Sequence, residues 1–234
     1  VALAEKVGGS EEAFVARMNE RAAELGMANT HFENVTGLDD DTVEHKTSAM
    51  DIAIMSRELL KHPKILEYSA IWMDTIRNGA FGLTNTNRLI RFYDGATGLK
   101  TGSTSKAKFC ISATAKRDNL HLIAVIMGAP TRDIRNETAK TLLDWGFANY
   151  SLYENKGGDV GAASVIGGVR DTCPGEIAPF SLLMAKGRHK NVTTEILFDE
   201  DIPAPIHKGE KIGSVRYLEN GEILAEESIL AAQD

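Results

Sequence analysis

Residue types that suit the binding of a carboxylate and of an oxyanion follow one another in residues 98–104, Gly-Leu-Lys-Thr-Gly-Ser-Thr. Lys100 supplies a fixed positive charge beside a nucleophile or a substrate carboxylate, and the hydroxyl of Thr101 can bond to that carboxylate. Gly102 has no side chain, so a substrate backbone can lie against the strand edge. The next residue, Ser103, can offer its backbone N–H to an oxyanion. The Lys-Thr-Gly triplet of residues 100–102 would fit equally well at the start of a strand with a solvated lysine. The surrounding sequence must therefore decide between a binding role and a structural one.

The segments around this run predict the sheet that positions it. Residues 108–116 and 121–128 are rich in Ile, Val and Ala and indicate two strands, and Arg117-Asp118-Asn119 between them supplies a hairpin turn. A helix is predicted over 135–150. Its apolar side is expected to carry Ala139, Leu142, Leu143, Phe147 and Tyr150. The candidate residues therefore lie at the start of a strand in a central antiparallel sheet.

The rest of the chain separates into a mixed first part and a β-rich second part. Ser10 is typical of an N-cap for a helix that ends near Gly26, and a second helix is predicted over about 47–61. The first residues look like the second half of a helix, so the chain is expected to begin within a domain. From about residue 151, short alternating runs separated by turn signals predict a small all-β domain. The expected domains are 1–150 and 151–234.

Composition excludes several classes of protein. The 234 residues carry 26 basic and 33 acidic side chains, a net charge of −7, whereas a nucleic-acid-binding protein usually has a basic surplus. The same charge argues against simple docking on an anionic membrane, and no run of about 18 apolar residues could span one. Cys110 and Cys173 lack metal-ligand spacing, so we expect two buried thiols, no metal and no cofactor.

Motifs in several segments occur in a characteristic order. They are 31–34 with 37–38, 45–53, 85–87, the Lys-Thr-Gly run, 109–110 with 122–129, and 135–146. Together they resemble the D-alanyl-D-alanine carboxypeptidases, the low-molecular-mass penicillin-binding proteins, and the β-rich tail resembles the second domain of that family. The resemblance implies an α+β fold, in which a partial serine hydrolase domain of the β-lactamase and penicillin-binding type precedes a small all-β sandwich domain.

The resemblance also implies a serine acyl-transfer mechanism. In the family, the serine of a Ser-x-x-Lys helix attacks the penultimate D-alanine carbonyl of a peptidoglycan stem pentapeptide. The family's catalytic positions match Lys100 and Ser103 in this chain. Ser103 would act through its backbone N–H, which completes the oxyanion hole. The implied substrate-binding residues are Lys100, Thr101, Gly102, Thr104 and Arg135. Arg135 matches an arginine near the terminal carboxylate, although an arginine at a helix start is often only a surface ion pair.

The chain departs from the family pattern in several places. No Ser-x-Asn occurs, and the one Ser-x-x-Lys match, Ser103-Thr104-Ser105-Lys106, lies on a predicted strand, where side chains three apart point to opposite faces. We therefore expect this polypeptide alone to be inactive and to form no covalent adduct with a labelled penicillin. Lys108 stands where the family often has glycine, and its charge is expected to face solvent. The family's membrane-anchoring helix is expected in the full-length protein and is absent here.

The function expected from the resemblance is that of an exported D-Ala-D-Ala carboxypeptidase that trims peptidoglycan and affects cell shape on the cell-wall side of the membrane. Its expected partners are stem peptides ending in D-Ala-D-Ala and β-lactam antibiotics, and no nucleic acid. Two alternatives stay open. One is a β-lactamase, which normally lacks the β domain, and the other is a catalytically inactive protein that binds peptidoglycan reversibly.

Four other features are interpreted as structural. His45 is expected to have no catalytic role. Asp39-Asp40-Asp41 is expected to form a solvated acidic loop, because it lacks the glycine and the distal glutamate of a calcium loop. Trp72 and Trp145 are expected in the core or in packing between domains.

Overall fold

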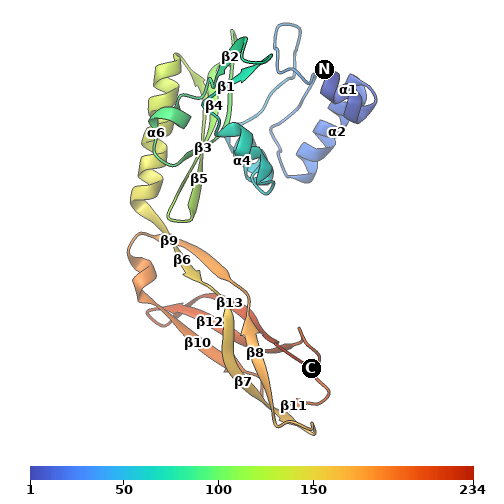
Figure 1. Ribbon diagram of the computed structural model, residues 1–234, viewed down its shortest axis with the longest axis vertical. Helices are drawn as coiled ribbons and strands as arrows, with labels where there is room; N and C mark the ends of the chain where they lie inside the picture. Colours follow the sequence, from blue (N-terminus) through green and yellow to red (C-terminus); the bar gives the residue numbers. More distant parts are fainter. The chain divides into compact units, whose positions relative to one another are not determined.

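The backbone divides after Phe147 into two units, Val1–Phe147 and Ala148–Asp234, in a computed structural model that describes all residues 1–234 (Figure 1). The first unit combines helices with an antiparallel sheet, and the second consists almost entirely of strands. Each unit has a buried apolar cluster of its own.

The first unit has six helices, and serine side chains cap the N-termini of two of them. The six helices are α1 Ala2–Gly8, α2 Glu11–Glu24, α3 Ala49–Leu59, α4 Lys64–Ser69, α5 Leu89–Phe92 and α6 Arg132–Asn149. The hydroxyl of Ser10 accepts a hydrogen bond from the N–H of Ala13, and that of Ser48 accepts one from the N–H of Asp51, both at 3.1 Å. These contacts confirm the two helices predicted near 10–26 and 47–61. No helix is both long and apolar enough to cross a membrane.

The central sheet of the first unit has the order β3-β4-β5. Its strands are β3 Ala96–Thr104, β4 Lys108–Arg117 and β5 Leu120–Ala129. Asp118 and Asn119 adopt positive φ values of 45° and 65° between β4 and β5, which confirms the predicted hairpin turn. Since β4 pairs with both neighbours, β3 is an edge strand with no partner strand on its outer side. A separate hairpin consists of β1 Met73–Ile76 and β2 Phe81–Thr84.

The central sheet has two differently packed faces, because successive side chains of a strand point to opposite sides. On one face Ala113 packs in an apolar cluster with Leu89 of α5 and Leu143 of α6. On the other face the hydroxyl of Ser112 lies 2.7 Å from that of Ser56 in α3. Figure 1 shows α6 and α4 on opposite sides of this sheet. The edge strand β3 therefore lies between helices that flank both faces.

The second unit is β-rich, as predicted. Its elements are β6 Tyr150–Asn155, β7 Gly158–Ile166, β8 Thr172–Ile177, β9 Phe180–Ala185, the 3-10 helix η1 Arg188–Asn191, β10 Val192–Phe198, β11 Ile202–Pro203, β12 Lys211–Glu219 and β13 Glu222–Ala231. Six strands form one sheet in the order β10-β12-β13-β8-β7-β11, and β6 pairs with β9. Tyr217, Ile229 and Ala231 are completely buried in its core.

Three details of the sequence interpretation were wrong. The helix α6 begins at Arg132, three residues before the predicted start, because the hydroxyl of Thr131 accepts a hydrogen bond from Ile134 N–H at 3.2 Å. Leu142 and Trp145 are 46% and 57% exposed, so neither belongs to the core of the first unit. Leu142 lies about 100° around the helix from the buried Leu143, which places it at the margin of the buried stripe.

Candidate active site

The edge strand β3 carries the candidate residues along its length, in register with β4. Thr101 lies opposite Ile111 and Lys100 lies opposite Ser112. Because Ile111 belongs to the cluster that α6 covers, Thr101 points to the α6 side of the sheet. Lys100 points to the other side, where α3 lies. The strand thus presents a cation on one face and a hydroxyl on the other.

All predicted site residues line one cavity of about 1580 Å³. These residues are Lys100, Thr101, Gly102, Ser103, Thr104 and Arg135. A site for a small ligand usually encloses several hundred Å³, so this volume has room for an extended peptide together with further protein segments. The first unit provides every side chain in its wall.

Polar side chains in the segment before α5 hold β3 in place. Thr86 and Thr101 have their hydroxyl oxygens 2.7 Å apart. The side-chain amide of Asn87, which is 2% exposed, donates to the carbonyl oxygen of Gly98 at 2.9 Å. The amide of Asn85 donates to the carbonyl oxygen of Ile71 at 2.9 Å. Residues 85–87 therefore fix the position of Thr101, a role that the sequence motif alone did not reveal.

Gly102 faces open space, whereas another glycine of the same strand does not. A Cβ atom built on Gly102 would meet no atom within 4 Å, but one on Gly98 would lie 2.7 Å from the Ser69 hydroxyl. Packing within the protein therefore explains the glycine at position 98 and does not explain the one at position 102. The free space beside Gly102 suits the close approach of a ligand backbone. Lys100 is exposed beside it, with its ammonium group in contact with the carbonyl oxygen of Thr101.

Arg135 is a buried cation that makes no ion pair. Its side chain lies in the first turn of α6 and the residue is only 3% exposed. The guanidinium donates to Asn136 Oδ1 at 3.0 and 3.2 Å and to the carbonyl oxygen of Cys110 at 3.5 Å. Burial, and then the charge of Arg132, hold the pKa of Arg135 below its usual range. The interpretation of Arg135 as a surface ion pair is therefore wrong, and a buried, uncompensated guanidinium suits an anionic ligand.

The turn after β3 contacts an acidic loop that lies far away in the sequence. The hydroxyl of Thr104 donates to the carboxylate of Asp39, and the ammonium of Lys106 donates to the carbonyl oxygen of Asp39. The interpretation of residues 39–41 as a solvated loop is therefore wrong for Asp39. A contact across 65 residues leaves no mark on the local pattern, so the sequence could not have revealed it.

The single Ser-x-x-Lys match does not form a nucleophile and base. Ser103 lies in β3, whereas Lys106 lies in the following turn and contacts Asp39. Lys108 is exposed, as expected, and it adopts a φ of 56°. Glycine reaches this left-handed region without strain, which explains why a small residue suits the position.

Three residues interpreted as structural lie in the wall of the cavity. The Nδ1 atom of His45 accepts a hydrogen bond from the N–H of Glu33 at 3.1 Å, which accords with a structural role. Trp72 packs edge-on against Phe92. Cys110 is only half-buried, because it lies opposite Gly102, which has no side chain to cover it. The expectation of two buried thiols therefore holds for Cys173 alone.

Comparison with known proteins gives two family matches that together cover most of the chain. The family described as D-alanyl-D-alanine carboxypeptidase matches residues 1–131. The family described as penicillin-binding protein 5, C-terminal domain, matches residues 147–234.

Individual relatives are similar along the whole chain. The D-alanyl-D-alanine carboxypeptidase DacF of Bacillus subtilis (strain 168) is 41% identical over 241 residues, which cover 100% of this chain and 61% of the relative. DacA of Haemophilus influenzae is 31% identical over 243 residues, which cover 100% of this chain and 60% of the relative. The crystal structure of penicillin binding protein 5 from Haemophilus influenzae has a TM-score of 0.78 at 29% identity, with 100% of this chain and 69% of that chain covered. The chain thus spans about three fifths of the length of the curated relatives it matches.

Proposed function

The chain belongs to the family of D-alanyl-D-alanine carboxypeptidases, and from that premise we propose that the protein removes the terminal D-alanine from peptidoglycan stem peptides that end in D-Ala-D-Ala. The relatives that carry this name support the proposal. The match of residues 147–234 to a penicillin-binding protein domain favours a carboxypeptidase over a β-lactamase, since β-lactamases normally lack such a domain.

The observation that carries the proposal is the pairing of an open strand edge with a buried, uncompensated arginine in one cavity. An extended peptide can add to the free edge of β3 through backbone hydrogen bonds, and Gly102 leaves room for it. Thr101 and Arg135 then suit the carboxylate at the peptide's C-terminus, because a guanidinium and a hydroxyl both donate hydrogen bonds to a carboxylate. Thr104 flanks the same region of the cavity.

The proposed chemistry is acyl transfer through a serine ester. The serine oxygen attacks the carbonyl carbon of the penultimate D-alanine, and the terminal D-alanine leaves with the proton that the serine loses. Water then hydrolyses the ester and releases the shortened peptide. In both steps the carbonyl oxygen becomes an oxyanion, to which the backbone N–H of Ser103 donates a hydrogen bond. The ammonium of Lys100 adds a positive charge close to the reacting groups.

The nucleophile of this reaction is not among the groups described above. Neither Ser-x-Asn nor a helical Ser-x-x-Lys occurs in the 234 residues, and the relatives extend beyond the aligned segment. We place the serine and its lysine in sequence outside these residues, seated against the cavity on the α3 side of β3, where Lys100 points. On this proposal the polypeptide of 234 residues recognises ligands but does not hydrolyse them.

The wider setting follows from the same activity. The substrate lies in the cell wall, so the protein acts outside the cytoplasmic membrane, and trimming of stem peptides affects cell shape. β-Lactam antibiotics would acylate the same serine. A related structure, penicillin-binding protein D2 from Listeria monocytogenes in the cefotaxime-bound form, is 33% identical with a TM-score of 0.57 over 62% of this chain. A membrane-anchoring helix in the full-length protein would hold the active site near its substrate.

A comparison of two polypeptides tests the proposed function. One is the chain of 234 residues, and the other adds the sequence encoded directly upstream of Val1. The longer protein is expected to release D-alanine from a stem pentapeptide and to take up one labelled penicillin per molecule, whereas the shorter one does neither. A stoichiometric adduct on any serine of residues 1–234 would contradict the proposal, and so would an inactive longer protein that binds no penicillin.

A further inference from the structure

The wall of the cavity carries far more positive than negative charge, although the whole chain has a net charge of −7. Its only carboxylate is that of Asp39. Its cationic side chains are Lys46, Arg88, Lys100, Lys106, Arg132 and Arg135. An excess of one sign inside a cleft attracts a ligand of the other sign, and the low-dielectric walls strengthen that attraction.

Four of these cations are outside the carboxylate site described above. Lys46 pairs with Glu44 and Lys106 contacts the carbonyl oxygen of Asp39, which leaves Arg88 and Arg132. Arg132 makes no ion pair, and its guanidinium carbon lies 5.8 Å from the centre of the Phe109 ring. Arg88 lies 3.7 Å from Asp133, and both side chains are mostly exposed, so this pair contributes little stability. Neither arginine is therefore held at the cavity by a buried ion pair.

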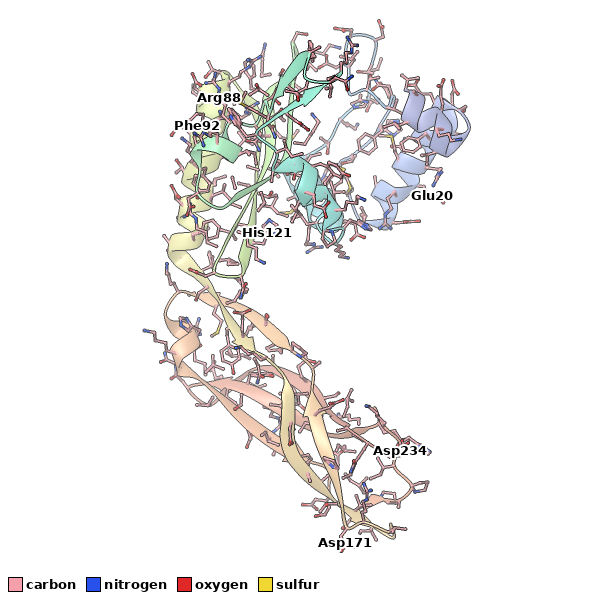
Figure 2. The ribbon with its side chains drawn as sticks, in the orientation of Figure 1. Glu20, Arg88, Phe92, His121, Asp171 and Asp234 are labelled. Carbon is pink, nitrogen blue, oxygen red and sulfur yellow. The ribbon has the colours of Figure 1, made fainter.

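Both arginines lie on the α6 side of the sheet, next to Arg135. Phe109, under Arg132, is opposite Ser103 in the register of the sheet and points to the same face as Thr101. Arg132 and Arg135 are three positions apart in α6, so their side chains lie on the same side of the helix, and the charge of Arg132 contributes to lowering the pKa of Arg135. Figure 2 shows Arg88 beside the first turn of α6, and its contact with Asp133 agrees with that position. These arginines add their positive charges on one side of the cavity, which favours an anion there.

We infer that Arg88 and Arg132 form a second anion subsite, which binds a negative charge on the side chain of the departing C-terminal residue. This inference rests on the proposed function, because it takes the carboxylate at Thr101 and Arg135 to be the peptide's C-terminus. A side chain on that last residue starts one carbon atom from the carboxylate, so it reaches groups beside Arg135. The ligand class is therefore a peptide that ends in an acidic D-residue.

The test compares acyl-D-Ala-D-Glu with acyl-D-Ala-D-Gln, which differ in charge but hardly in shape. Binding of each peptide to the chain of 234 residues is measured by calorimetry in about 50 mM salt, where surface charges are weakly screened. The glutamate peptide is expected to bind about fivefold more tightly, the effect of one or two exposed charge pairs. Arg132→Gln, alone or with Arg88→Gln, is expected to reduce the ratio of the two peptide affinities to below about twofold.

Matched controls separate this subsite from a general effect of charge. Arg91→Gln removes the same charge from an exposed residue of α5 that is outside the cavity wall, and it should leave the ratio unchanged. A glutamate placed on the acyl side of D-Ala-D-Ala should bind with an affinity that Arg132→Gln does not alter.

The outcomes distinguish the inference from the function on which it rests. Equal binding of the two peptides to the unchanged protein, or a ratio that survives loss of both arginines, would overturn the second subsite and leave the proposed function standing. Failure of every peptide, including acyl-D-Ala-D-Ala, to bind would overturn both.

Discussion

The two units of the molecule place their large apolar side chains differently. Nineteen of the exposed ones lie in Val1–Phe147 and only five in Ala148–Asp234, although the first unit is less than twice as long. The second unit buries Tyr217, Ile229 and Ala231 completely in one continuous cluster. The first unit leaves a large cavity open beside its sheet and buries polar groups such as Asn87 and Arg135 around it.

This difference indicates a division between function and stability. We propose that the groups around the cavity of the first unit are arranged for a ligand, which leaves side chains such as Phe92 and Met127 exposed there. In the second unit, the side chains are arranged for packing against one another. Changes at the cavity should therefore alter activity with little effect on stability, and changes in the β core should do the reverse. The predictions below test this separation.

The largest effect is expected from Lys100→Ala in the catalytically complete protein. Lys100 is exposed in the cavity and pairs with no carboxylate, so its loss should hardly change the free energy of unfolding. The rate of D-alanine release should fall about a thousandfold, as when a group that stabilises an oxyanion is removed. Lys116→Ala, on the exposed part of β4, is the control and should retain the full rate. A loss of rate that tracks a loss of folded protein would contradict the separation.

In the core of the second unit, a substitution is expected to lower stability rather than activity. Ile229 is completely buried in β13, so Ile229→Ala should lower the free energy of unfolding by about 2–5 kcal/mol, measured by urea titration. Ile223→Ala changes the same residue type in the same strand at a position that is 54% exposed, and it should cost less than about 1 kcal/mol. Similar losses for both variants would show that the β core is less well packed than described.

A smaller effect is expected at an ion pair in the second unit. The side chain of Glu219 is 3% exposed, and its hydrogen bonds with Arg188 hold the pKa of its carboxyl below the ordinary value of 4.5. The pair therefore stabilises the fold above about pH 4.5, and this contribution is lost as the pH falls through the lowered pKa. Glu219→Gln should reduce stability at pH 7 and weaken its decline in acid, measured by urea titration across pH. The exposed Glu210→Gln should follow the unchanged protein; identical pH curves for Glu219→Gln would contradict the assignment.

The smallest effect is expected at a strained residue in the first unit. Lys108 has a φ of 56°, a conformation that costs an ordinary residue about 1 kcal/mol more than glycine. Lys108→Gly should raise the free energy of unfolding by about 0.5 kcal/mol, because the greater freedom of glycine in the unfolded chain offsets part of the gain. Lys108→Ala keeps the strain and should give no such increase, so equal stabilities of the two variants would contradict the explanation.

The sequence predicted what depends on local patterns. The hairpin of β4 and β5 follows from apolar runs around Asp118 and Asn119, and the N-cap of α2 follows from Ser10. The run of residues in β3 could be placed on a strand for the same reason. These features involve residues that are close in the sequence, where propensity and turn chemistry act directly.

The parts that could not be predicted depend on contacts between distant residues. Asp39 reaches Thr104 across 65 positions. The burial of Arg135 results from packing of α6 on the sheet, and a local pattern cannot distinguish it from a surface arginine. The cavity-lining position of Arg132 likewise depends on Phe109 in β4. The charged residue types at these positions did not indicate burial or a place in the cavity wall, because most charged residues of any sequence lie on the surface.

The most direct test of the account concerns the carboxylate that Thr101 and Arg135 are proposed to bind. Since Arg135 is buried, it is safer to change the ligand than the protein. The chain of 234 residues is titrated with acyl-D-Ala-D-Ala and with the C-terminal amide of the same peptide, and shifts of its backbone amide NMR signals are followed. The account predicts that the acid binds about tenfold more tightly, as a hydrogen-bonded charge pair requires, and shifts the signals of residues 101–104 and 135. Equal binding of acid and amide, or shifts confined to the second unit, would contradict it.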